Sequence, residues 1–223
     1  MHPTKRFFLA AFLGLLTLAG PLRAGDGEVL RLYLDADFTH TPAVGEGIEL
    51  GIRTALSRHG AETWIDLVAV DHRANARRSL YTAERADADP GAIAVMGGMH
   101  SPPYLTFNAE MNALGIPFLL PWSAGAAITR GSLGADNWFF RVSVDDAQAA
   151  PFLVQAAVRA GCREPAVVAL DNPWGRGNAA AASEAMRPAG IGDLAVHMMP
   201  AAGGPVLAAR IVADIAARGS DCL

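Results

Sequence analysis

Short apolar segments alternate with helical patterns along most of this chain, and this alternation constrains the fold more than any other feature. The apolar segments recur roughly every 25 to 35 residues, which suits a strand, a covering helix and the next strand. Strands are predicted at 29–34, 64–70, 92–96, 116–120, 166–170 and 194–198. Helices are predicted at 46–59, 76–88, 102–114, 145–160, 178–186 and 206–218. This repeat indicates an α/β fold whose parallel sheets are covered by helices on both faces.

The alternation is interrupted once, by an extended aromatic segment that runs from Trp138 to Val142. A new helical pattern then begins at Asp145, so we interpret the segment as a crossing into a second lobe. This divides the chain into an N-terminal lobe at 25–142 and a second lobe at 143–223. No predicted strand follows the last helix, so the second lobe is expected to be incomplete; a compact short variant is the alternative.

The first 24 residues have the pattern of a signal peptide for export. Lys5 and Arg6 precede a 14-residue apolar run, and Ala24 stands where a signal peptidase could cut before Gly25. The alternative, a membrane anchor, is disfavoured because roughly 20 residues are needed to span a bilayer. The mature chain is therefore expected to be exported and soluble, and no cysteine near the junction indicates a lipid anchor.

The charge of the chain argues against one large class of partners. The formal net charge is −4, and no cluster of basic residues offsets it. Neither a nucleic acid nor an anionic membrane surface is therefore expected as a partner.

Only two cysteines occur, Cys162 and Cys222, and each precedes a strand that is predicted or expected. An exported chain meets an oxidising compartment, where such a pair can close into a disulfide. The alternative is two free thiols, because the sequence alone fixes no distance between them.

Two serine-containing loops follow neighbouring predicted strands, one with Ser101 and one with Ser123. Because the carboxyl ends of parallel strands open at one edge, where ligands usually bind, both loops are expected to meet there. Ser101 immediately precedes Pro102, as is typical of a helix N-cap. Its hydroxyl can serve as a cap alone, as a donor to an anionic ligand beside the free N–H groups of the helix start, or as both.

Five motifs, taken in order, resemble those of one protein family. They are GEGIELGI at 45–52, AVMGGMHS at 94–101, GIP at 115–117 with PWSA at 121–124, FRVS at 140–143 and DNPWGRG at 171–177. Together they resemble the exported solute-binding proteins of bacterial ABC importers, in the type I family that binds branched-chain amino acids and amides. The resemblance implies two Rossmann-like lobes that close on a ligand. It also implies a periplasmic location, an inner-membrane ABC permease as partner, a monomer and no cofactor.

The same resemblance suggests roles for individual residues. Relatives hold the carboxylate and amine of the ligand with the loops after the third and fourth strands, at positions matched by Ser101, Ser123 and the backbone of Ala124. Trp174 matches an aromatic residue that relatives place against the ligand, and loop packing is its alternative role. Tyr104 is a candidate for packing and, through its polar tip, for ligand contact. The acidic residue that relatives provide for an ammonium group would come after the end of this chain.

We therefore predict an exported substrate-binding protein of an ABC importer. It would capture a small polar solute such as a branched-chain amino acid or amide, and it would catalyse no reaction. An extracellular ligand-sensing domain of the same fold is the first alternative.

A serine hydrolase is a weaker alternative. The sequence PWSAG at 121–125 nearly matches the nucleophile motif G-x-S-x-G, and Asp171 and His197 follow in the matching order. However, a proline replaces the first glycine, and His197 lies inside a predicted strand instead of on a loop that could reach Ser123.

Neither a metal nor a nucleotide is predicted. Asp35 and Asp37 are close in sequence, but no two histidines have the spacing of a zinc site. Gly45 and Gly47 are not followed by the third glycine of the dinucleotide fingerprint, because Leu50 occupies that position.

Overall fold

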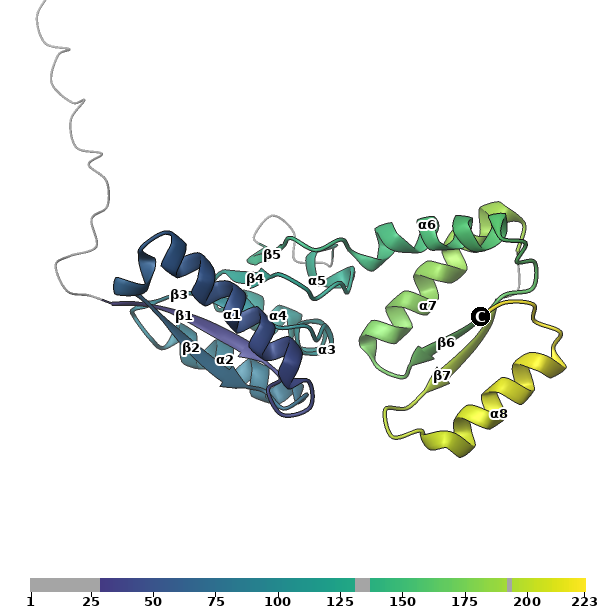
Figure 1. The fold of residues 1–223 in the computed structure, drawn as a ribbon, viewed down its shortest axis with the longest axis horizontal. Helices are drawn as coiled ribbons and strands as arrows, with labels where there is room; N and C mark the ends of the chain where they lie inside the picture. Colours follow the sequence, from purple (N-terminus) through teal and green to yellow (C-terminus); the bar gives the residue numbers. More distant parts are fainter. Residues whose placement is uncertain (1–28, 131–136, 192–193) are drawn as a thin grey trace, which may run out of the picture.

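A computed structural model describes residues 29–130, 137–191 and 194–223, and in these ranges the chain forms two α/β units joined by one crossover (Figure 1). The predicted signal peptide at 1–24 lies outside the described residues. Within the described ranges, no helix combines the length and the apolar character needed to cross a membrane.

The first unit contains a five-stranded sheet in the order β2-β1-β3-β4-β5. Its strands are β1 (Leu30–Ala36), β2 (Ile65–Asp71), β3 (Ala92–Gly97), β4 (Phe118–Leu120) and β5 (Phe139–Arg141). Every neighbouring pair is parallel, and Leu34 of β1 lies opposite Ala69 on one side and Met96 on the other. All loops that follow strands therefore emerge at one edge of the sheet, which is where the candidate site lies.

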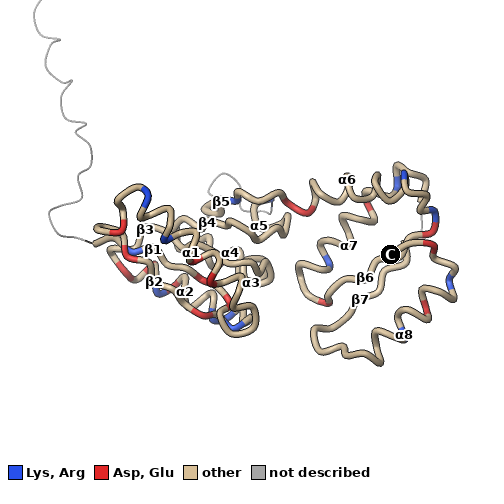
Figure 2. Tube along the Cα trace, in the orientation of Figure 1, with Lys and Arg blue, Asp and Glu red and all other residues tan. Residues whose placement is uncertain are grey.

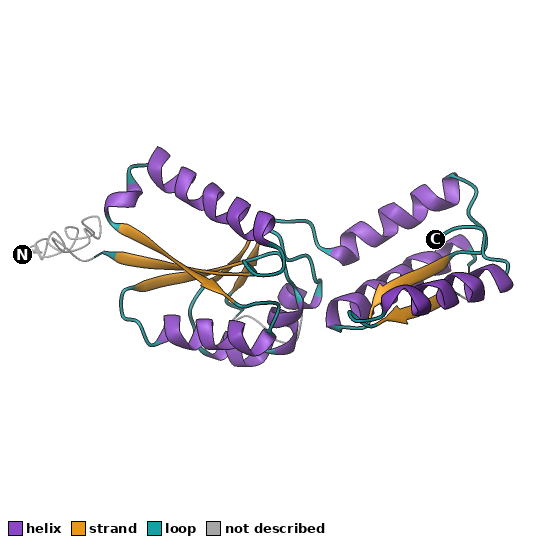
Figure 3. Cartoon of the chain, turned by 60° about the horizontal axis from the view of Figure 1, so that its bottom comes forward, coloured by secondary structure: helices purple, strands orange, loops and turns teal. Residues whose placement is uncertain are grey.

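Helices cover both faces of this sheet (Figure 3). One face carries α1 (Pro42–Arg58), and the other carries α2 (Ala76–Asp87), α3 (Pro102–Thr106) and α4 (Asn108–Ala113). The alternation of side chains along β1 produces two cores. Leu32 and Leu34 belong to the core that contains Ile48 and Ile52 of α1. Tyr33 belongs to the core that contains Leu80 of α2, Tyr104 of α3 and Met111 of α4.

The second unit begins with α6 (Asp146–Arg159), which follows the crossover after β5. Its other elements are β6 (Ala166–Leu170), α7 (Pro173–Met186), the 3-10 turn η2 (Arg187–Ala189), β7 (Ala195–Met199) and α8 (Gly204–Ala217). Strands β6 and β7 form a two-stranded parallel sheet. The prediction of an α/β fold with parallel sheets and covering helices is thus confirmed.

Cys162 and Cys222 form a disulfide in the second unit, with their Cα atoms 5.7 Å apart. Cys222 also forms a parallel bridge with Pro165, the residue just before β6. Since β7 pairs with β6 as well, β6 has chain on both sides at this end.

Three predicted helices have clearly different bounds in the structure. The helix expected at 46–59 begins earlier, at Pro42, because proline suits the first position of a helix. The helix expected at 102–114 is divided into α3 and α4, because Phe107 has a non-helical backbone conformation with φ −115° and ψ 30°. The helix expected at 178–186 begins earlier, at Pro173, because the Asn172 side chain caps it by accepting a hydrogen bond from the Gly175 N–H (2.9 Å). The structure also contains helix α5 (Ala127–Arg130) and the 3-10 turn η1 (Ala61–Thr63), which the sequence did not indicate.

Besides the crossover, α3 of the first unit lies in contact with α7 of the second. The carboxyl edge of the first sheet and the beginning of the second unit are therefore close together.

Candidate functional site

The two serine-containing loops meet at the carboxyl edge of the first sheet. The Ser123 hydroxyl shares its one proton between the carbonyl oxygens of Gly98 (2.9 Å) and His100 (3.2 Å). In the opposite direction, the Gly125 N–H donates to the Ser101 hydroxyl oxygen (3.1 Å). The loop at 98–101 and the loop at 121–125 are therefore fastened to each other, and they form one continuous rim.

Both serines are buried in this rim. Ser101 is 5% exposed and Ser123 is 0% exposed. Ser101 does occupy the N-cap position of α3, but its side chain makes no capping hydrogen bond, so the predicted capping role is wrong. Its oxygen accepts from Gly125 instead, and α3 has only five residues, which gives it a weak dipole for an anion. Both hydroxyls thus hold the two loops together.

Ala124, between Ser123 and Gly125, is half-buried, and its carbonyl oxygen accepts a hydrogen bond from the N–H of Asp146 (3.0 Å). Asp146 is the first residue of α6. The predicted contact residue Ala124 therefore touches the start of the second unit through its backbone.

Tyr104 is 1% exposed and lies inside the core of the first unit. Its hydroxyl donates a hydrogen bond to the carboxylate of Asp35 (2.8 Å), and its ring packs against Phe118 and Phe139. Burial, followed by the charge of Asp35, raises the pKa of Tyr104 well above its ordinary value. The polar tip predicted for this residue thus reaches Asp35.

Trp174 lies in the first turn of α7 and is half-buried. Its indole N–H donates a hydrogen bond to the carboxylate of Asp146 (2.6 Å). Burial raises the pKa of Asp146, against the opposing effect of this hydrogen bond. Asp146 therefore contacts one predicted ligand residue through its side chain and another, Ala124, through its backbone.

The two fastened loops also expose the side chains of His100 and Trp122, which were not among the proposed ligand residues. The His100 side chain is 25% exposed, and Trp122 is 52% exposed. The only sequence signal for them was adjacency, because each precedes one of the serines. Burial, followed by the nearby His72, lowers the pKa of His100.

Behind His100 lies a buried polar cluster made of Asp35, Asp37 and His72. Nε2 of His100 lies 3.5 Å from the Asp37 carboxylate, and the rings of His72 and His100 meet edge to face at 5.4 Å. Burial alone would raise the pKa of Asp37, but hydrogen bonds from His40 lower it below its ordinary value. Burial raises the pKa of Asp35 in spite of the nearby His72.

This cluster does not have the geometry of a metal site. In the described ranges, only Cys162, Asp221 and Cys222 bring three potential ligand atoms within 4.8 Å of one another. The two sulfur atoms of that group already form the disulfide.

The hydrolase arrangement is not formed either. The proton of the Ser123 hydroxyl is directed at backbone carbonyls, those of Gly98 and His100. His197 lies in β7 of the second unit, whereas Ser123 lies at the edge of the first sheet.

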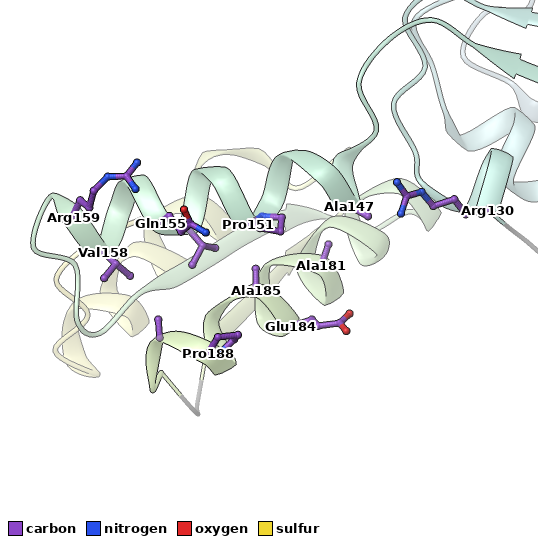
Figure 4. Close-up of a pocket in the computed structure, with 12 residues that line it drawn as sticks. Arg130, Ala147, Pro151, Gln155, Val158, Arg159, Ala181, Glu184, Ala185 and Pro188 are labelled. Carbon is purple, nitrogen blue, oxygen red and sulfur yellow. The ribbon is translucent and has the colours of Figure 1, made fainter.

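Two hollows lie on or beside the second unit. A cavity of about 730 Å³ lies between α6 and α7 and is lined mostly by alanine, proline and valine, with Arg130 of the first unit at one end (Figure 4). It contains none of the residues that the sequence analysis proposed for ligand binding. A second cavity of about 460 Å³ is lined by residues of α6, β6 and α7, among them Trp174 and Asp146.

Comparison with known families shows what the chain is similar to. A family model described as periplasmic binding protein matches residues 39–222. No curated protein sequence matches the chain.

Solved structures with the same fold include three solute-binding proteins. One is an ABC transporter solute-binding protein from R. palustris in complex with 4-hydroxybenzoate, with 17% identity, a TM-score of 0.74, and coverage of 88% of this chain and 54% of that one. Another is an ABC transporter substrate-binding protein from Desulfitobacterium hafniense in complex with Leu. It has 21% identity, a TM-score of 0.63, and coverage of 87% of this chain and 57% of that one. The third is a leucine-binding protein from Thermotoga maritima, with 18% identity, a TM-score of 0.70, and coverage of 84% of this chain and 53% of that one. This chain therefore spans little more than half the length of each.

Proposed function

Because the chain belongs to the periplasmic binding protein family, we propose that it is an exported substrate-binding protein of an ABC importer. It captures a small polar solute between its two units outside the cytoplasm and presents the closed form to a membrane permease. It works as a monomer without a cofactor, and it makes or breaks no bond in the solute.

One observation carries this proposal. The loops after β3 and β4 are fastened together at the carboxyl edge of a parallel sheet, and the same rim contacts the start of the second unit. Ligands of open α/β sheets bind outside the carboxyl ends of the strands, so this rim is the expected place for the solute.

We assign the residues of the rim two kinds of role. Ser101 and Ser123 hold the loops in position, and Tyr104 supports them from the core through Asp35. The backbone at Ala124 and the ring of Trp174 face the solute from the two units.

His100 and Trp122, the exposed side chains of the two loops, add a ring N–H donor and an apolar surface to the rim.

A small carboxylate is the solute class that we propose. Leucine and 4-hydroxybenzoate, which occur in structures of the same fold, both carry a carboxylate on an apolar body. The rim has matching properties, because it carries the imidazole of His100 and the exposed indole of Trp122. Whether the solute also carries an ammonium group separates branched-chain amino acids from aromatic acids.

The solute is captured because its binding favours the closed state of the two units. A solute bound to the first unit alone contacts only the rim, whereas in the closed state it also contacts the second unit. The solute therefore shifts the population toward the closed state by the difference in binding free energy between the two states.

Isothermal titration calorimetry tests the proposal with L-leucine, 4-hydroxybenzoate, acetamide and urea as probes. We expect heat of binding with a carboxylate probe and none with urea. Ser101→Ala removes the acceptor of the Gly125 N–H and should weaken binding about tenfold, equivalent to about 1.4 kcal/mol.

Ser183→Ala is the matched control, because the Ser183 hydroxyl donates only to a carbonyl within α7 (2.9 Å) and lies away from the rim. Its affinity should equal that of the wild type. Absence of heat with every probe would contradict the proposed function, and equal binding by Ser101→Ala would contradict the proposed rim.

A further inference from the structure

The crossover between the two units contains a buried ion pair. Arg141 is the last residue of β5 and Asp145 is the N-cap residue of α6, and their side chains are only 6% and 5% exposed. An Nη2 atom of Arg141 lies 3.1 Å from the Asp145 carboxylate. Figure 2 shows the acidic segment at the start of α6, directly after β5. Burying such a pair is costly, because both charges lose water and must be compensated by partners within the protein.

The same guanidinium group also holds the loop at 121–126. Its Nη1 donates a hydrogen bond to the carbonyl oxygen of Gly125 (2.8 Å), and its Nη2 donates to the Thr129 hydroxyl (2.9 Å). Gly125 in turn donates its N–H to Ser101. A β-carbon at Gly125 would lie 3.1 Å from Cβ of Ser101, so the loop is closely packed at this point.

Asp145 and Asp146 extend the connection into the second unit. The Asp145 carboxylate caps α6 by accepting from the Gln148 N–H (2.9 Å). Asp146 donates its N–H to the Ala124 carbonyl and accepts the indole N–H of Trp174. A continuous chain of contacts therefore runs from the serine rim, through Arg141 and the start of α6, to Trp174 of α7.

We propose that Arg141 is a positioning residue that couples the loop at 121–126 to the start of α6. The planar guanidinium group directs separate N–H groups at the loop and at the helix cap. The compact ammonium group of a lysine could not contact both equally well. A shift of the loop on solute capture is thereby transmitted to the second unit. This inference rests on the proposed function, since capture is what would shift the loop.

Hydrogen exchange on the ligand-free 223-residue chain tests the coupling directly. Arg141→Gln removes the charge, and Asp145→Asn removes the ion pair but keeps a good helix cap. In both variants, amides at 121–126 and at 146–150 should exchange together at least about tenfold faster, while those of α2 keep their wild-type rates. Unchanged α2 rates separate local uncoupling from global loss of stability.

Arg130→Ala is the matched control. Arg130 also pairs with Asp145 (2.7 Å), but its side chain is half exposed. Its removal should leave both segments within about twofold of the wild-type rates, because Arg141 still bridges them. Acceleration confined to one segment in Arg141→Gln, or equal acceleration in Arg130→Ala, would overturn the proposal.

Arg141→Lys is a second variant, for use if Arg141→Gln does not fold. It keeps the positive charge and therefore an ion pair with Asp145. It should give an intermediate effect, because lysine cannot contact the Gly125 carbonyl and Asp145 with two parallel N–H groups. Faster exchange of both segments in Arg141→Gln and Asp145→Asn, without calorimetric binding of any probe, would support the coupling and reject only the proposed solute capture. If a probe does bind, it should protect both segments in the wild type but only 121–126 in Arg141→Gln; protection of both in the variant would overturn the proposal.

Discussion

Asp71, the last residue of β2, fixes the loop between β1 and α1 at the carboxyl edge. Its carboxylate accepts hydrogen bonds from the N–H groups of Phe38 and Arg73, each at 3.0 Å, and from the Thr39 hydroxyl at 2.6 Å. Burial alone would raise its pKa, but the Thr39 bond, the backbone bonds and the charge of Arg73 lower it to about 2. These contacts are therefore strongest with the ionised carboxylate.

The lowered pKa predicts acid-sensitive stability. Since the folded pKa lies below the ordinary value of 3.8, the stabilisation is complete above about pH 4 and is lost as the pH falls toward 2. Its size at neutral pH is at most about 2 kcal/mol. Asp71→Asn should lose this stability at pH 6 and show a flatter decline below pH 4 in urea unfolding.

Asp66→Asn is the control for this prediction, because Asp66 lies exposed on the same strand. It should retain the full acid dependence of the wild type. If Asp71→Asn kept the acid dependence of the wild type, the loss of stability between pH 4 and pH 2 would have to come from another group.

The loops of the candidate rim were predictable from sequence, but the tasks of their side chains were not. Serine after a strand indicates a loop at the carboxyl edge, and the loops of Ser101 and Ser123 do meet there. Whether Ser101 caps its own helix depends on a partner 24 positions away, Gly125. Sequence spacing contains no information about such a contact, because it forms only when β3 and β4 are adjacent.

At the scale of elements, one glycine determines how closely α7 approaches β6. A β-carbon on Gly175 would lie 1.9 Å from the carbonyl oxygen of Leu170, which is the last residue of β6. A backbone carbonyl cannot move aside as a flexible side chain can. Helix α7 can therefore sit at the end of β6 only with glycine at this position.

Gly175→Ala should destabilise the second unit by about 2 kcal/mol or more, through overpacking against the backbone. The measurement is urea unfolding followed by far-ultraviolet circular dichroism. Gly177→Ala is the matched control in the same helix, because nothing lies within 4 Å of its β-carbon. This control should be neutral or up to about 1 kcal/mol more stable, since alanine favours helix. A loss of stability equal to that of Gly175→Ala would reject the packing argument.

The alternation of elements was predictable because it reflects a periodic apolar pattern. All six predicted strands are present, and the extended aromatic segment contains β5. Element boundaries were less predictable where local and distant contacts compete. Phe107 interrupts a pattern that reads as continuous helix, and the neighbouring Asn108 donates its side-chain amide to the carbonyl of Ile128. Asn172 was a cap that could have been read from the sequence, because Pro173 follows it.

On the scale of the whole molecule, the two described units differ in how much core they bury. The first unit contains two extended clusters of buried side chains on the two faces of its sheet. The second has a two-stranded sheet, and large apolar side chains of α6 and α8 are exposed, including Phe152 (68%), Leu153 (63%) and Val206 (79%). Its stability must therefore depend more heavily on covalent and local constraints.

The disulfide is such a constraint. It joins residues 60 positions apart and closes a loop that includes β6, α7, β7 and α8. A loop of this length restricts the unfolded chain enough to stabilise the folded unit by about 4 kcal/mol in the chain-entropy model. Reduction with dithiothreitol should therefore accelerate hydrogen exchange in α6, α7 and α8 and leave α2 of the first unit near its original rate.

The double variant Cys162→Ser/Cys222→Ser supplies the control, because it should match the reduced wild type and respond no further to dithiothreitol. The distinction matters for the proposed function, since the rim contacts the second unit at α6, whose C-terminal end leads into Cys162. A second unit loosened by reduction would still hold Asp146 near Ala124 but would lose the fixed position of α7 and Trp174. Equal effects of dithiothreitol on both units, or on the double variant, would show that the disulfide does not stabilise the second unit selectively.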